Sequence, residues 1–107
     1  NRVGDRGAVA VAHGARASQS LRHINLAGNQ IGDEGAAALA EAAVRPAPLK
    51  RLNLYDNLIG DSGALALAEA FDLGTSLVYL DLKRNLLSMP LRTKLKMLAA
   101  EGSLLFI

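Results

Sequence analysis

Residues 49–63, LKRLNLYDNLIGDSG, contain a pattern that returns at a fixed distance on both sides. Leucines stand at 49, 52 and 54, followed by an asparagine, an isoleucine and a Gly-Asp-x-Gly segment. The same residue types occur 28 positions earlier, from Leu21 to Gly35, and most of them 28 positions later, from Leu77 to Leu87. Recurrence at an equal interval predicts a repeat architecture in which each unit packs on the next.

The composition suits one thin repeat domain. The chain has 107 residues, half of them hydrophobic, but only two Tyr, two Phe and no Trp. This length is enough for one domain, and a solenoid core layered by Leu and Ala needs few bulky side chains. The absence of cysteine excludes disulfides and thiolate metal sites.

Charge and hydropathy exclude further classes. The formal net charge is only +2, so no strong field attracts nucleic acid. No apolar run approaches the roughly 20 residues of a membrane span, and no signal peptide is recognisable. Because glycosylation sequons are also absent, we expect an intracellular, cytoplasmic chain with neither a nucleic-acid nor a membrane partner.

The repeat divides the chain into a partial unit at 1–20, three repeats and the start of a further strand at 105–107. The repeats span 21–48, 49–76 and 77–104. Alternation of apolar and polar residues predicts strands at 21–26, 51–54 and 79–82. Alanine-rich runs predict helices at 5–16, 33–44 and 61–71. The register of the last strand stays open by one residue.

The third repeat departs from the pattern after Leu87. Ser88 is predicted to cap a helix that has Pro90 in its first turn. The apolar stripe of this helix consists of Leu91, Leu95, Leu98 and Ala99.

Taken together, LxxLxLxxNxIGDxGAxALAEA resembles the leucine-rich repeat of the ribonuclease-inhibitor type, which also occurs in Ran GTPase-activating proteins and NOD-like receptors. The resemblance is strong over residues 21–71 and covers nearly the whole chain. It implies an α/β solenoid of three to four repeats, a right-handed β-α superhelix with strands on the concave face and helices on the convex face. It also implies that Asn29, Asn57 and Asn85 form a buried ladder that binds backbone groups of neighbouring turns.

Two sets of residues fit the interior of this solenoid. Leu52, Leu54, Ile59 and Leu67, with their equivalents, are expected to fill the layer between strands and helices. Alanines are expected to keep the helices slim, at positions 36–38, 40, 42, 43, 64, 66, 68 and 70.

No catalytic constellation is found. There is no HExxH, GxSxG, P-loop or GxGxxG motif, and His13 falls at a solvated helix position. Asp5, Asp33 and Asp61 occur once per repeat, too far apart to converge on one metal ion, so we interpret each as the cap of its own helix. The sequence therefore predicts a protein that is not an enzyme and needs no cofactor or metal.

Basic residues gather toward the end of the chain, at Lys83, Arg84, Arg92, Lys94 and Lys96. They fit either a patch for nucleic acid or an acidic partner, or an ordinary solvated face. The second interpretation is favoured because aromatic residues are not interleaved and the total charge is small.

The side chains that point outward from the strands are the candidate binding residues. The first column across the sheet is His23, Arg51, Tyr79, and the second is Asn25, Asn53, Asp81. The third is Ala27, Tyr55, Lys83, and the fourth is Gly28, Asp56, Arg84. Tyr and Arg are common at interface hot spots. Arg51, Tyr55 and Tyr79 are therefore predicted to dock a protein partner of unknown identity.

Three functions fit these features. The leading one is a non-enzymatic protein-binding module, part of a larger protein or assembly. A GTPase-activating module and an architectural subunit of a large complex are the alternatives. The repeat ends show no obvious polar cap, so self-association or neighbouring subunits are expected there.

Overall fold

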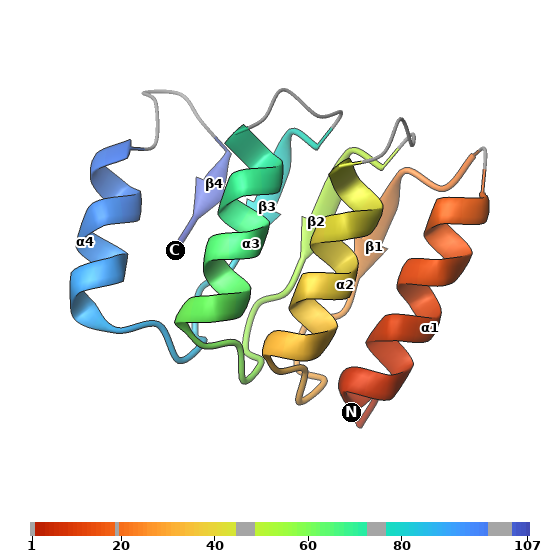
Figure 1. Ribbon diagram of the computed structural model, residues 1–107, viewed down its shortest axis with the longest axis horizontal. Helices are drawn as coiled ribbons and strands as arrows, with labels where there is room; N and C mark the ends of the chain where they lie inside the picture. The colour runs from red at the N-terminus through yellow and green to blue at the C-terminus, as the bar shows by residue number, and fades with distance from the viewer. Residues whose placement is uncertain (1, 19, 45–48, 73–76, 99–103) are drawn as a thin grey trace.

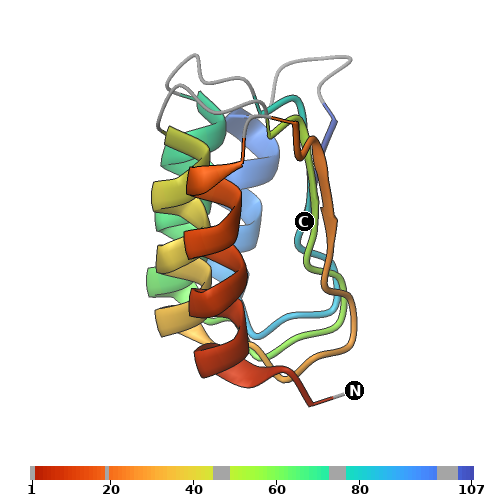
Figure 2. The same ribbon diagram turned by 90° about the vertical axis from the view of Figure 1, so that its right-hand side faces the viewer.

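The computed structural model describes residues 2–18, 20–44, 49–72, 77–98 and 104–107. Helices and strands alternate along this described chain: α1 (Gly4–Ala17), β1 (His23–Asn25), α2 (Asp33–Val44), β2 (Arg51–Asn53), α3 (Asp61–Asp72), β3 (Tyr79–Asp81), α4 (Met89–Leu98) and β4 (Leu105–Phe106). Figure 1 shows the helices side by side in one layer. Figure 2 shows that this layer covers a single face of the sheet. The predicted α/β solenoid is therefore confirmed.

The strands form one parallel sheet in the order β1-β2-β3-β4. Equivalent positions lie 28 residues apart across the first three strands, as in His23, Arg51 and Tyr79. The last strand differs, because Leu80 pairs with Leu105, only 25 residues later. The pairing settles the register that the sequence left open. Helix α4 still begins 28 residues after α3, so the shorter interval arises after the start of α4.

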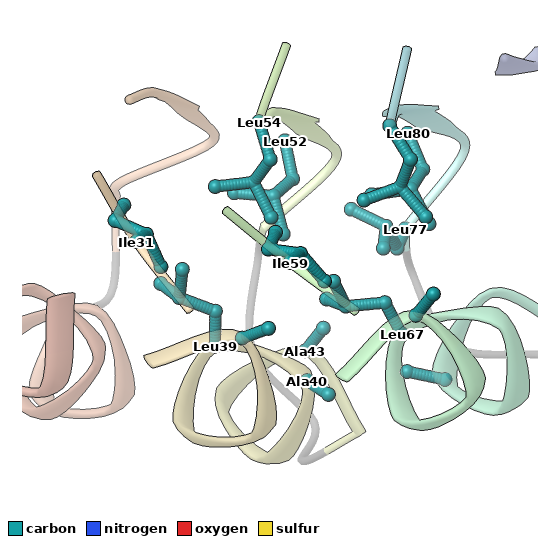
Figure 3. Close-up of a cluster of buried hydrophobic side chains, with 14 of the residues drawn as sticks. Ile31, Leu39, Ala40, Ala43, Leu52, Leu54, Ile59, Leu67, Leu77 and Leu80 are labelled. Atoms are coloured by element: carbon teal, nitrogen blue, oxygen red, sulfur yellow. The ribbon is translucent and has the colours of Figure 1, made fainter. Parts of the chain in front are cut away.

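One apolar core fills the space between the two layers. Leu52 and Leu54 from the strand side meet Ile59 and the helix residues Leu39 and Leu67, and all five are fully buried. Figure 3 shows these side chains pointing toward one another between sheet and helices. Burying one such side chain contributes about 1.5–3 kcal/mol to folding. The predicted core residues are confirmed.

Helices α1, α2 and α3 approach closely because small residues occupy the positions where they touch. A Cβ atom added to Gly35 of α2 would lie 2.9 Å from the Cβ of Ala8 in α1. A Cβ atom added to Gly63 of α3 would lie 2.9 Å from the Cβ of Ala36. Glycine and alanine therefore set the spacing of the helices in the first three repeats.

The asparagine ladder is confirmed. The side-chain oxygen of Asn57 accepts hydrogen bonds from the N–H groups of Asn29 (2.9 Å) and Ile31 (3.0 Å) in the preceding repeat. Its amide nitrogen donates to the Leu26 carbonyl at 3.0 Å. Asn85 binds the second repeat in the same way, through the Leu54 carbonyl. These bonds satisfy backbone groups that the buried turns would otherwise leave unpaired.

The aspartates cap helices, but the prediction that each caps its own helix is wrong. Asp5 lies within the first turn of α1, and its Oδ1 accepts hydrogen bonds from the N–H groups of Gly32 (2.7 Å) and Gly35 (3.0 Å) at the start of α2. Asp33 binds Gly60 and Gly63 at the start of α3 in the same way. Each aspartate therefore caps the helix of the following repeat.

The start of α4 uses a different arrangement. The Ser88 N–H donates to Asp61 at 2.8 Å, and the Ser88 hydroxyl accepts the N–H of Leu91, as predicted for an N-cap. The backbone N–H of Ser88, and secondly its hydroxyl, hold the pKa of Asp61 below its ordinary value of 3.8. Serine here supplies one of the two bonds that aspartate makes to the earlier helices.

Some predictions fall where the structure is not described. Leu91 and Leu95 of the predicted α4 stripe are buried, whereas Ala99 and the side chain of Leu98 lie outside the described part. The repeat boundaries after residues 48 and 76 also fall at its edges.

Candidate functional site

The candidate site is the strand face, defined here as the outward side chains of β1–β4 and of the two or three residues that follow each strand. Strand pairing aligns His23, Arg51 and Tyr79 in the first predicted column. It aligns Asn25, Asn53 and Asp81 in the second. Backbone bonds extend the alignment beyond the strands, because the Gly28 N–H donates to the Tyr55 carbonyl and the Asp56 N–H to the Lys83 carbonyl.

The predicted residues differ in how much of them a partner could reach. Six are exposed: His23, Asn25, Arg51, Asp56, Lys83 and Arg84. Asn53, Tyr55 and Tyr79 are half-buried. Asp81 is only 7% exposed, so its carboxylate is nearly covered. The reachable part of the strand face therefore excludes Asp81.

The second column has a structural task that the sequence analysis did not assign. Asn25, Asn53 and Asp81 each accept a hydrogen bond from the N–H group two residues later, at 3.2, 3.0 and 2.9 Å. Such Asx turns end the strand and bend the chain toward the helix. These side chains are consequently held in place by their own backbone.

The fourth column holds the backbone in the left-handed region. The φ angles are +70° at Gly28, +59° at Asp56 and +58° at Arg84. Glycine adopts this conformation without strain, whereas a side chain there costs roughly 1–2 kcal/mol. Asp56 and Arg84 also form an exposed ion pair, with Nε and Oδ1 3.8 Å apart. Two repeats therefore carry a charged residue where glycine fits the backbone best.

Cations and aromatic rings alternate over the strand face. The guanidinium of Arg51 lies 4.3 Å from the ring centroid of Tyr79. The Lys83 ammonium lies 5.5 Å from the ring centroid of Phe106 and 6.0 Å from that of Tyr55. The rings of Tyr79 and Phe106 are themselves 5.5 Å apart. These distances fit cation–π and tilted aromatic contacts.

Phe106 is the residue of this face that sequence reasoning missed. It pairs with Asp81, so it belongs to the second column. A 28-residue count places that column at 109, beyond the chain, and so gives Phe106 no outward role. Its aromatic type within an apolar strand was the available signal, but only the register reveals that it points outward.

The C-terminal basic cluster is divided between two surfaces. Lys83 and Arg84 lie on the strand face, whereas Lys94 and Lys96 are exposed on α4. Arg92 is half-buried and donates to the backbone carbonyls of Leu87 and Asn85. The five residues do not form one continuous patch, which agrees with the favoured solvated interpretation.

We find no candidate for metal binding or membrane insertion in the described part of the chain. Among those residues, no three His, Cys, Asp or Glu side chains gather in a way that could hold a metal ion. No described helix combines the length and apolar character needed to cross a bilayer.

The fold and the ladders of the described repeats define a repeat solenoid with an open strand face. Comparison with known families adds that residues 17–40 and 46–68 match the family described as Leucine Rich repeat. The chain is therefore a leucine-rich repeat protein. Domains of this family generally mediate protein–protein interaction and are typically not enzymes. Comparison with curated proteins finds no match.

Proposed function

We propose that the chain is a non-enzymatic protein-binding module whose strand face docks a protein partner. The observation that carries this proposal is the group formed by Arg51, Tyr55 and Tyr79 on one sheet, with Arg51 stacked on Tyr79. Tyr and Arg are the side chains most often found at interface hot spots. A packed sheet presents them in a fixed arrangement, which lowers the entropy lost on binding.

The backbone behind these residues supports the same proposal. Leu52, Leu54 and Leu80 fix the strands to the core, and all three are fully buried. The turn bonds of Asn53 and Asp81 fix the residues that follow the strands. The strand face is therefore arranged before a partner arrives.

We also assign the repeats to the ribonuclease-inhibitor type, and the chain to the cytoplasm. The 28-residue interval and the α-helix in each repeat support the subtype. The lack of cysteine supports an intracellular setting, where disulfides are rare.

A second candidate is an architectural subunit, favoured by an exposed apolar group outside the strand face. Leu58, Leu86 and Met89 are 51%, 63% and 72% exposed. Apolar groups of this kind often mark contacts with neighbouring subunits. A monomer by solution mass measurement, unchanged by Leu58→Ser and Leu86→Ser together, would contradict this candidate.

The docking proposal is tested with a triple variant, Arg51→Ala, Tyr55→Ala and Tyr79→Ala. A partner is first captured from the source cell, then purified and titrated against the chain. We expect the triple variant to bind at least about 10-fold more weakly, a change of about 1.4 kcal/mol. Circular dichroism and thermal unfolding establish that the variant is folded.

A matched control removes three exposed side chains from the helices: Glu69→Ala, Lys94→Ala and Lys96→Ala. This control is expected to bind like the parent chain. Equal binding by both triple variants would refute docking through the strand face.

A further inference from the structure

The charges of the strand face are unbalanced. Arg51, Lys83 and Arg84 are exposed cations, whereas Asp81 is nearly covered and Asp56 is paired with Arg84. Arg22 and Lys50 add exposed positive charge just before β1 and β2. The other described acidic residues lie on the helices, at Asp5, Asp33, Glu34, Glu41, Asp61, Glu69 and Asp72. Positive charge thus gathers on one face of a chain whose formal net charge is only +2.

From this distribution we propose that the partner of the strand face is acidic: a protein segment whose carboxylates bind Arg51, Lys83 and Arg84. The inference rests on the proposed function and adds the chemistry of the partner. Complementary charge raises the association rate and selects among partners. Carboxylates form short, charge-assisted hydrogen bonds with guanidinium and ammonium groups.

Aromatic contacts prepare these cations for carboxylates. Arg51 lies 4.3 Å above the Tyr79 ring, and a guanidinium stacked by its face keeps its N–H edge available for bidentate bonding. Lys83 lies near both Tyr55 and Phe106. Arg84 lies 5.9 Å from the Tyr55 ring centroid. Contact with a ring restricts a long side chain, so less conformational entropy is lost when a carboxylate binds.

Backbone strain points to the same residues. Arg84 holds φ at +58°, at a position that is glycine in the first repeat. Strain at a position where a better residue exists is typical of sites under functional constraint. Glycine at position 84 would relieve the strain but remove one of the three cations.

A polynucleotide is the competing occupant, since phosphates also attract cations. However, three of the basic residues near the C-terminus lie on α4, and Arg92 there binds backbone carbonyls. The remaining cations are interspersed with the carboxylates of Asp56 and Asp81, which repel a phosphate backbone. The strand face therefore suits discrete carboxylates better than a continuous polyanion.

The test measures binding of a labelled peptide rich in glutamate by fluorescence anisotropy, at low and at physiological salt. Its control is the same peptide with glutamine in place of glutamate. We expect the glutamate peptide alone to bind the parent chain. Arg51→Gln, Lys83→Gln and Arg84→Gln together are expected to weaken its binding at least about 10-fold.

A matched variant separates the site from net charge. Arg6→Gln, Lys94→Gln and Lys96→Gln remove the same charge from exposed positions on α1 and α4. This variant is expected to bind the glutamate peptide within about 3-fold of the parent chain, because screening limits the effect of distant charges. Both triple variants are checked for folding by circular dichroism.

Three results would overturn the inference: no binding of the glutamate peptide, equal losses in the two triple variants, or tighter binding of duplex DNA or RNA than of the peptide. A partner captured through Arg51, Tyr55 and Tyr79 whose contact segment lacks acidic residues would also overturn it. That last result would leave the proposed docking function intact.

Discussion

At the scale of single residues, each Gly-Asp-x-Gly segment contains side chains and spaces that belong to contacts with different repeats. Asp33 reaches forward and accepts the N–H groups of Gly60 and Gly63. Gly63 in turn faces back, and a Cβ atom placed on it would lie 2.7 Å from Oδ1 of Asp33 and 3.0 Å from its Cα atom. The absence of a side chain at Gly63 is what allows the carboxylate to reach the helix start.

Gly63→Ala is therefore expected to destabilise the chain. A backbone atom blocks the new methyl group, so the repeats must separate, at a cost of about 1–3 kcal/mol. Gly14→Ala is the matched control, because Gly14 lies in a helix with no atom within 4 Å of its added Cβ. It is expected to stabilise the chain by roughly 0.5–1 kcal/mol. Urea unfolding measures both, and equal effects would refute the close-contact explanation.

The sequence predicted the residue type at this site but not its partner. A helix-start aspartate normally caps its own helix, and nothing local distinguishes Asp5 or Asp33 from that common case. The distinction depends on the distance between adjacent helices, which follows from packing at Ala8 and Ala36. Only the stacked repeats bring the carboxylate within reach of the next helix.

At the scale of elements, the helices are linked in series by their N-terminal turns. Asp5 of α1 binds α2 and Asp33 of α2 binds α3, each through two N–H groups. Asp61 of α3 binds the N–H of Ser88 just before α4. Each helix start therefore depends on a carboxylate from the preceding helix.

The last of these links is expected to weaken in acid. The N–H and hydroxyl of Ser88 favour the ionised form of Asp61, so its pKa in the folded chain lies below 3.8. A lowered pKa stabilises the fold above the ordinary pKa, and this stabilisation is lost as the pH falls through the lowered value. Asp61→Asn should thus be less stable than the parent at neutral pH. The difference should shrink below about pH 3.

Urea unfolding of the parent and of Asp61→Asn at both pH values measures this difference. A difference that is independent of pH would show that the ionised carboxylate of Asp61 contributes nothing.

Most elements were predictable because their signals are local. Alanine-rich runs gave α2 and α3 within a residue of their bounds, and Ser88 gave the start of α4. The register of β4 was not predictable. Its residues are uniformly apolar, so alternation does not show which of Leu105 and Phe106 points inward. The sheet resolves this through pairing with β3.

At the scale of the whole molecule, one core runs through all the described repeats. In such a stack, stability is approximately the sum of the repeats and of the contacts between neighbours. A residue in an inner repeat therefore supports two contacts, whereas its equivalent in an outer repeat supports one.

Leu54→Ala is expected to cost about 2–5 kcal/mol, because Leu54 is fully buried in the middle of the stack. Leu26→Ala, the equivalent change in the first strand unit, is expected to cost less. Leu26 is 8% exposed and has a neighbouring strand on one side only within the described chain. Thermal and urea unfolding of the 107-residue chain measure both variants. A larger loss for Leu26→Ala would contradict the repeat register.

The strand face was predictable in its columns but not in its contacts. Counting by 28 aligned Arg51 with Tyr79 and Tyr55 with Lys83, since that interval holds from β1 to β3. Which cation stacks on which ring depends on side-chain conformation, which periodicity does not encode. The role of Phe106 depends on the 25-residue interval before β4, which no earlier repeat announces.

The same interval has a consequence for where the chain tolerates a change of length. Bonds of the asparagines and aspartates, spanning 26 to 31 residues, fix the path from each strand to the start of its helix. The path from a helix to the next strand is shorter by three residues before β4, yet β4 still pairs in register. An inserted tag or a deletion of a few codons should thus be accepted after a helix and rejected before it.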